Sequence, residues 1–89
     1  MTATRYRRHP SAIWRATHSF LVASLPPAPP SRVVGSAAAI WNALEAPRTL
    51  DDVVDDLVVA TGAERATISR DVTALVGELV HLGLVEVVS

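Results

Sequence analysis

Cysteine is absent from this chain of 89 residues, which excludes a disulfide scaffold, a thiolate zinc site and a cysteine nucleophile. No uninterrupted apolar run approaches the roughly 18 residues of a membrane-spanning helix. The segment Phe20 to Leu25 is too short and too late for the core of a signal peptide. We therefore expect a cytoplasmic protein with no membrane partner.

Acidic residues are absent from residues 1–35, which carry five of the eight arginines, whereas residues 36–89 carry all nine acids. The net charge of −1 neither demands nor forbids nucleic acid. Apolar residues make up 49% of the chain, which suffices for a packed core, and its length fits one domain. Residues 1–10 are polar and basic, so we expect a flexible arm there and a single domain over residues 11–89.

Two runs rich in β-branched and aromatic residues predict a β-hairpin near the N-terminus. These runs are Ile13 to Thr17 and Phe20 to Leu25, separated by the polar pair His18-Ser19. The prolines of residues 26–30 end the second strand and make a stiff spacer. Residues 31–34 then predict a short third strand.

Helical spacing of apolar residues, bounded by capping residues and by proline or glycine, predicts three helices after these strands. They are one helix of about ten residues from Ser36, one from Thr49 to Gly62, and one from about Glu64 to Leu82. Leu84 to Val88 is able to form a final strand. A hairpin, a short third strand and three helices predict an α+β domain of the winged helix-turn-helix type.

No residue pattern indicates catalysis or a metal site. His9, His18 and His81 have no partner at ligand spacing, and nothing pairs a nucleophile with a base. The acids at positions 51, 52, 55 and 56 share the polar side of the second helix and predict a solvated acidic face. We therefore expect neither an enzyme nor a cofactor.

The third helix carries more apolar surface than one core requires. On a wheel of 100° per residue, a core stripe is predicted at Ile68, Val72, Leu75, Leu79 and Leu82. Further round the helix lie Val76 and Val80, with Ser69 between them and Arg65 at the rim. This flank indicates either a groove for a partner segment or a surface covered by the C-terminal tail.

DNA binding is the alternative hypothesis for the same elements. Residues 64–72 resemble the recognition helix of winged-helix transcription regulators, and residues 82–85 resemble the passage from helix to wing. In that interpretation Thr67, Ser69 and Arg70 face a major groove. Seven acids on the second and third helices argue against it, because DNA affinity depends on cations near the phosphate backbone.

A second resemblance covers residues 9–88. It is carried by His9-Pro10 with Ile13-Trp14, by residues 34–44 (VGSAAAIWNAL), by residues 47–54 (PRTLDDVV), and by Asp71-Val72 leading to Leu79, Gly83, Leu84 and Val85. These features resemble the family similar to pyrroloquinoline quinone biosynthesis protein D. Its members are the recognition elements for ribosomally synthesised and modified peptides.

This resemblance implies a non-catalytic protein that binds the leader of a precursor peptide as an added strand, antiparallel to the third strand and against the third helix. The implied edge is Ser31, Arg32, Val33 and Val34, and the implied helix wall is Arg65, Ser69, Val72, Val76 and Val80. The implied partner is a separate tailoring enzyme, either a leader peptidase or a radical S-adenosylmethionine enzyme. A lone module of this length that ends soon after Gly83-Leu84 resembles members from lasso-peptide biosynthesis. A purely structural module, or a dimer through the same edge, is a further hypothesis.

Overall fold

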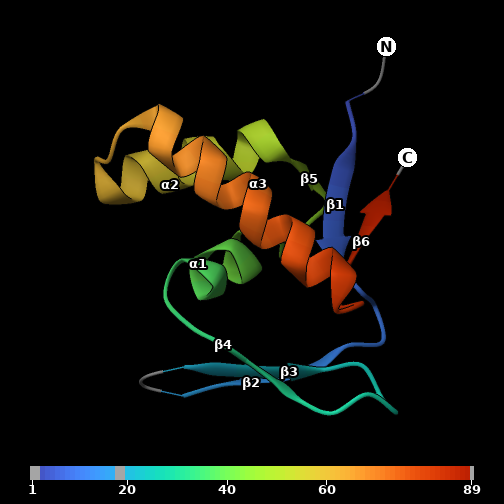
Figure 1. The fold of residues 1–89 in the computed structure, drawn as a ribbon. Coiled ribbons are helices and arrows are strands. Elements are labelled where there is room, and N and C mark those ends of the chain that lie inside the picture. Colours follow the sequence, from blue (N-terminus) through green and yellow to red (C-terminus); the bar gives the residue numbers. More distant parts are fainter. Residues whose placement is uncertain (1–2, 18–19, 89) are drawn as a thin grey trace.

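The computed structural model of the protein describes residues 3–17 and 20–88, which form two three-stranded antiparallel sheets and three helices. Figure 1 shows the three helices packed together above one sheet, with β1 and β6 of the other sheet beside them. The α+β class, with a hairpin, a third strand and then three helices, is confirmed.

The lower sheet, in the order β2-β3-β4, contains the three strands predicted from the sequence. Their bounds are β2 (Ile13–Ala16), β3 (Leu21–Ser24) and β4 (Ser31–Val33). At the tip of the hairpin the backbone N–H of Thr17 donates to the carbonyl oxygen of Phe20 over 2.8 Å. The turn itself, His18-Ser19, lies outside the described residues.

The second sheet includes residues 5–8, which belong to the segment predicted as a flexible arm. Arg5–Arg8 form β1, which lies between β5 (Arg48–Thr49) and β6 (Val85–Val88). The strand is held because Tyr6 packs against the core and His9 donates its backbone N–H to the carbonyl oxygen of Leu84. Both neighbouring strands come from distant parts of the chain, so no local pattern indicates this pairing.

The three helices are α1 (Ser36–Ala43), α2 (Leu50–Thr61) and α3 (Arg65–His81). α2 begins with a capping box in which Asp52 N–H donates to Thr49 Oγ1 and Thr49 N–H donates to Asp52 Oδ2. It stops at Gly62, whose φ of 69° is left-handed. α1 departs from prediction, because Gly35 rather than Ser36 is its N-cap and it ends well before Pro47.

The core lies between the helices and the two sheets. Its buried apolar residues are Leu21, Ala23, Val33, Ile40, Trp41, Leu44, Val53, Val54, Leu57, Val72, Val76, Leu79, Leu84 and Val85. This set corrects the predicted stripe of α3: Val76 is in the core, whereas Leu82 is 49% exposed. None of the helices in the described ranges is long and apolar enough to cross a membrane.

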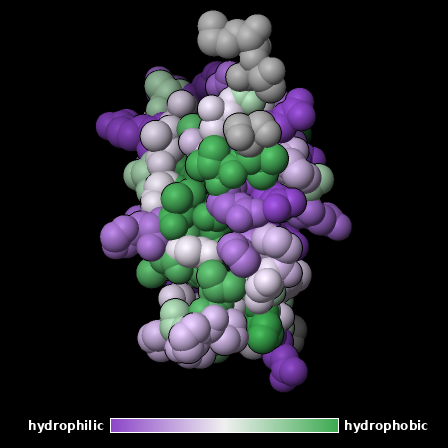
Figure 2. All heavy atoms as spheres, turned by 90° about the vertical axis from the view of Figure 1, so that its right-hand side faces the viewer, coloured by the Kyte–Doolittle hydropathy of each residue, from purple (hydrophilic) through white to green (hydrophobic). Residues whose placement is uncertain are grey.

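The side of the molecule that carries β1 and β6 is mixed in polarity. Figure 2 shows hydrophobic residues there in a column that hydrophilic residues interrupt. β6 contributes the exposed Val87, and the Arg7 side chain of β1 forms an ion pair with Glu86. No wide continuous apolar surface is visible on this side.

Arg8 joins the two sheets. Its guanidinium lies 4.8 Å from the ring centre of Trp14 on β2 and 5.3 Å from that of Trp41 on α1. Its Nε donates to the carbonyl oxygen of Trp41 over 2.8 Å, and the two indole rings meet edge to face at 6.2 Å. Burial lowers the pKa of Arg8 from its ordinary value, and the charge of Glu45 opposes that shift. One cation therefore ties β1 to the hairpin and to α1.

We expect Arg8→Ala to reduce the free energy of unfolding by roughly 1–3 kcal/mol, because it removes a charge-assisted hydrogen bond and two ring contacts. Urea denaturation followed by tryptophan fluorescence measures this loss. Arg5→Ala, in the same strand but exposed, is the control, with a change of roughly 0.5 kcal/mol or less. Equal losses in the two variants would contradict the role of Arg8.

Candidate functional site

The acidic residues of α2 form a solvated face. Asp51, Asp52, Asp55 and Asp56 are all exposed. Two of them form ion pairs, Asp56 with Arg48 and Asp55 with Arg65. Within residues 3–17 and 20–88 there is no group of three or more histidine, aspartate or glutamate residues placed to hold a metal ion.

The outer edge of β4 is one of the sheet edges with unused bonding capacity, since β2, β4, β5 and β6 each lie at the edge of a sheet. Thr17 and Phe20 form a hydrogen-bonded pair. In an antiparallel ladder, hydrogen-bonded pairs alternate with pairs that are not hydrogen-bonded. Arg15 and Val22 therefore form the next hydrogen-bonded pair. Val22 therefore directs its backbone N–H and C=O towards β2. Its neighbours Leu21 and Ala23 direct theirs towards β4.

The same alternation assigns the backbone groups of β4. Ser31 and Val33 lie opposite Ala23 and Leu21, so they bond to β3. Arg32, opposite Val22, directs its N–H and C=O away from β3. No strand of the described part of the chain pairs with this second side of β4. An exposed edge of this kind accepts a further strand.

α3 runs along this free edge in the opposite direction to β4. Near its beginning, Ile68 and Asp71 share a cavity with Gly35, which follows β4. Just after the C-terminal end of α3, Gly83 lies beside Leu25. A β-carbon on Gly83 would be 3.5 Å from the Cδ2 atom of Leu25. Leu25 follows β3 at the end where β4 begins. Figure 1 shows the opposed directions of β4 and α3.

One flank of α3 faces this edge. Ile68 and Asp71 line the shared cavity, and helical spacing puts Leu75, Glu78 and Leu82 on the same flank. Ile68 and Leu75 are half-buried, while the other three are exposed. The flank is therefore apolar next to the core and acidic at its outer border.

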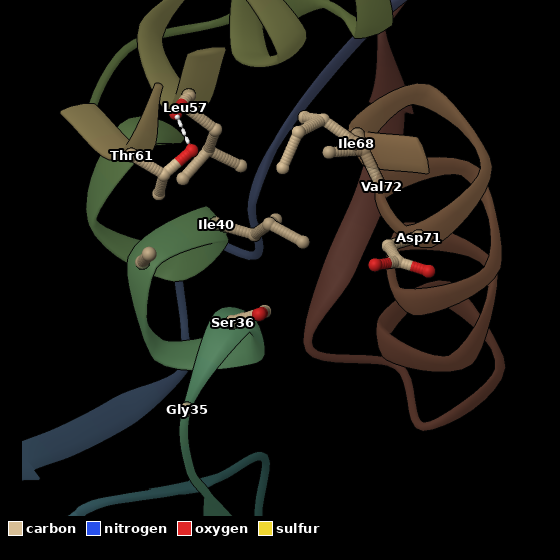
Figure 3. Close-up of a pocket in the computed structure, with 9 residues that line it drawn as sticks. Gly35, Ser36, Ile40, Leu57, Thr61, Ile68, Asp71 and Val72 are labelled. Atoms are coloured by element: carbon tan, nitrogen blue, oxygen red, sulfur yellow. Dashed lines mark hydrogen bonds between the residues drawn. The ribbon is translucent and has the colours of Figure 1, made fainter. Parts of the chain in front are cut away.

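The cavity between the end of β4 and α3 has a volume of about 260 Å³. Its walls are Gly35, Ser36, Ala39 and Ile40 of the β4–α1 segment, Leu57 and Thr61 of α2, and Ile68, Asp71 and Val72 of α3. In Figure 3 the side chains of Ile40, Ile68 and Val72 line the space between the helices, and the Thr61 hydroxyl donates to the Leu57 carbonyl oxygen. The interior is apolar, and the polar Ser36, Thr61 and Asp71 are exposed.

Charges of opposite sign border the two sides of this site. On β4 the Arg32 guanidinium lies over the Phe20 ring, 4.2 Å from its centre, and forms no ion pair with any residue in the described ranges. On α3 the exposed acids are Asp71 and Glu78, which likewise have no ion-pair partner among the described residues. A ligand between them meets a cation on the sheet side and carboxylates on the helix side.

The structure separates the predicted site residues into three groups. Ser31, Arg32, Val33 and Val34 lie together at β4, although Val33 is buried and only Arg32 and Val34 are exposed. Val72 lines the cavity floor, and Val76 belongs to the core instead of a groove wall. The remaining three, Arg65, Ser69 and Val80, lie on the other flank of α3.

Arg65 is directed towards α2. Its guanidinium donates a hydrogen bond to Asp55 Oδ1, and this bond, with the charge of Asp55, raises the pKa of Arg65. The predicted helix wall thus includes residues on the flank that faces α2, whereas the cavity at Gly35 lies beside the other flank. Both flanks carry apolar residues, so hydropathy alone contains no signal that distinguishes them.

Comparison with models of known protein families gives a match. Residues 32–85, more than half of the chain, match the family model for Coenzyme PQQ synthesis protein D (PqqD). The matched segment runs from β4 through the three helices to the first residue of β6. Searches of curated proteins and of solved structures gave no match. On the family match, this chain belongs to the PqqD family, the recognition elements for ribosomally synthesised and modified peptides.

Proposed function

We propose that this protein binds the leader of a precursor peptide as a strand added to the free edge of β4. The single observation that carries this proposal is that Arg32 directs its backbone N–H and C=O away from the sheet, along an edge that faces α3. In strand addition the main chain provides affinity, and pockets for alternate side chains provide specificity.

Membership of the PqqD family supports this proposal. PqqD proteins are non-catalytic accessory proteins that bind precursor peptides and work with modifying enzymes such as radical S-adenosylmethionine enzymes. We further propose that this protein delivers the bound leader to a separate enzyme. Our first candidate for that enzyme is a leader peptidase of lasso-peptide biosynthesis, and a radical S-adenosylmethionine enzyme is the second.

The binding test uses fluorescence anisotropy with a labelled leader from a precursor peptide encoded beside the gene. We expect saturable binding with a Kd in the micromolar range or tighter, typical of a short peptide held by one strand edge. A scrambled peptide and a generic DNA duplex are the controls. Binding to DNA that weakens with salt, without leader binding, would contradict the proposal and favour the transcription regulator.

The free N–H of Arg32 is tested by comparing Arg32→Pro with Arg32→Ala. Both variants remove the guanidinium, but only proline removes the backbone donor, and proline is tolerated where that donor points away from the sheet. We expect Arg32→Pro to bind the leader roughly ten-fold more weakly than Arg32→Ala, since a hydrogen bond contributes about 1 kcal/mol and its unpaired acceptor adds to the loss. Anisotropy titrations measure the ratio, and circular dichroism checks the fold.

Val33→Pro is the companion variant. It removes a donor used within the sheet, so we expect a loss of stability of about 2 kcal/mol or more.

Equal leader affinities for Arg32→Pro and Arg32→Ala would rule out strand addition at β4.

The helix side of the site is tested by Leu82→Glu. Leu82 is 49% exposed on the flank of α3 that faces β4, so a charge there is compatible with folding but opposes an apolar ligand. We expect the leader Kd to rise roughly ten-fold, which corresponds to about 1.4 kcal/mol. Val59→Glu, on the surface of α2 and 86% exposed, is the matched control and should leave the Kd unchanged. Equal effects of the two variants would contradict this assignment.

A further inference from the structure

Taking strand addition at β4 as given, we propose that the site selects leaders by a short pattern: an aromatic or branched apolar residue followed three positions later by an acid. The acid lies opposite Arg32, and the apolar side chain enters the cavity at Gly35. This inference rests on the proposed function and specifies the class of peptide that it binds.

The acidic position follows from the orientation of Arg32. Residues directly opposite each other in an antiparallel pair carry their side chains on the same side of the sheet. The ligand residue bonded to the Arg32 backbone therefore carries its side chain on the same side of the sheet as the Arg32 side chain. That guanidinium rests on the Phe20 ring and has no carboxylate partner within residues 3–17 and 20–88. A ligand aspartate or glutamate supplies one.

The apolar position follows from the alternation of side chains along the added strand. The ligand residues before and after the acid face inward, as Ser31 and Val33 do. Because the added strand is antiparallel, its N-terminal part passes Val33 and then Gly35. The first inward-facing ligand residue before the acid lies opposite Val33, one position before the acid. The next one lies three positions before the acid, beside Gly35 and Ser36. These two residues line the cavity, whereas Val33 does not.

The size and polarity of the cavity define the side chain that it accepts. An apolar cavity of roughly 150 Å³ admits a benzene ring, so 260 Å³ accommodates one aromatic or branched aliphatic group. Ile40, Leu57 and Val72 make the interior apolar. Asp71 is exposed at the mouth without an ion-pair partner in the described chain, so it repels an acid at this end. The two requirements therefore have a fixed order along the peptide.

Selection from a displayed library of random 12-residue peptides tests the pattern independently of any one leader sequence. We expect the wild-type protein to enrich an acid three positions after an aromatic or branched apolar residue. Arg32→Glu should replace the acid with a basic residue and leave the apolar position unchanged. Ala39→Leu, which adds volume inside the cavity, should shift the apolar preference to smaller side chains and leave the acid unchanged.

Two control variants carry the same chemical changes outside the site. Arg15→Glu lies on the same side of the sheet and in the same cross-strand row as Arg32, but on the far strand β2. Ala60→Leu lies exposed on α2 and does not line the cavity. Both controls should reproduce the wild-type pattern. Individual selected peptides should lose about two- to five-fold in affinity when the acid becomes an amide, the range of an exposed ion pair.

The outcomes separate this inference from the proposed function. If peptides are enriched and bind Arg32→Pro more weakly than Arg32→Ala, but the pattern is the same in Arg32→Glu and Ala39→Leu, strand addition stands and the selectivity pattern is wrong. Enriched peptides that bind independently of β4 overturn both proposals, as does the absence of any enriched peptide.

Discussion

The hydrogen-bond alternation of β4 is the constraint on which the account of this protein depends. Ser31 and Val33 direct their backbone groups into the sheet, and Arg32 directs its own outward. The short strand is thus anchored by two residues and leaves one complete donor and acceptor pair unused. Val33 also buries its side chain in the core, which fixes the register and the direction of the free edge.

The rest of the fold places one flank of α3 and a cavity beside the free edge of β4. Arg8 holds β1 against the hairpin and α1, so the two sheets form one body around the helices. α3 is packed on the core through Val72, Val76 and Leu79, and this packing turns the flank with Asp71 and Leu82 towards β4. The cavity at Gly35 arises where the end of β4, α1, α2 and α3 meet.

The sequence predicted the local elements well because their signals are local. The capping box at Thr49 and the left-handed Gly62 mark the bounds of α2 in the sequence and in the structure. β1 was missed because its partners, residues 48–49 and 85–88, are far away in the chain, so its polar sequence alone resembles an unstructured end. Strand pairing over such separations is decided by tertiary packing.

The flank of α3 that faces β4 could not be identified from the sequence for a similar reason. Residues 31–34 stand out as a short strand after the proline spacer, and residues 31–33 form β4. On α3 the apolar residues span an arc wide enough for either flank to be the core. The burial of Val72, Val76 and Leu79 in the core decides this and leaves the Asp71 flank facing β4. Helix periodicity contains no information about that choice.

Hydrogen exchange of the β4 amides, measured by NMR with and without leader peptide, tests the central claim most directly. In the free protein, the account predicts slow exchange at Ser31 and Val33 and fast exchange at Arg32. Leader binding should then slow the exchange of the Arg32 amide, because it becomes bonded to the added strand. An Arg32 amide that is already protected in the free protein, or that exchanges equally fast in the complex, would contradict the account.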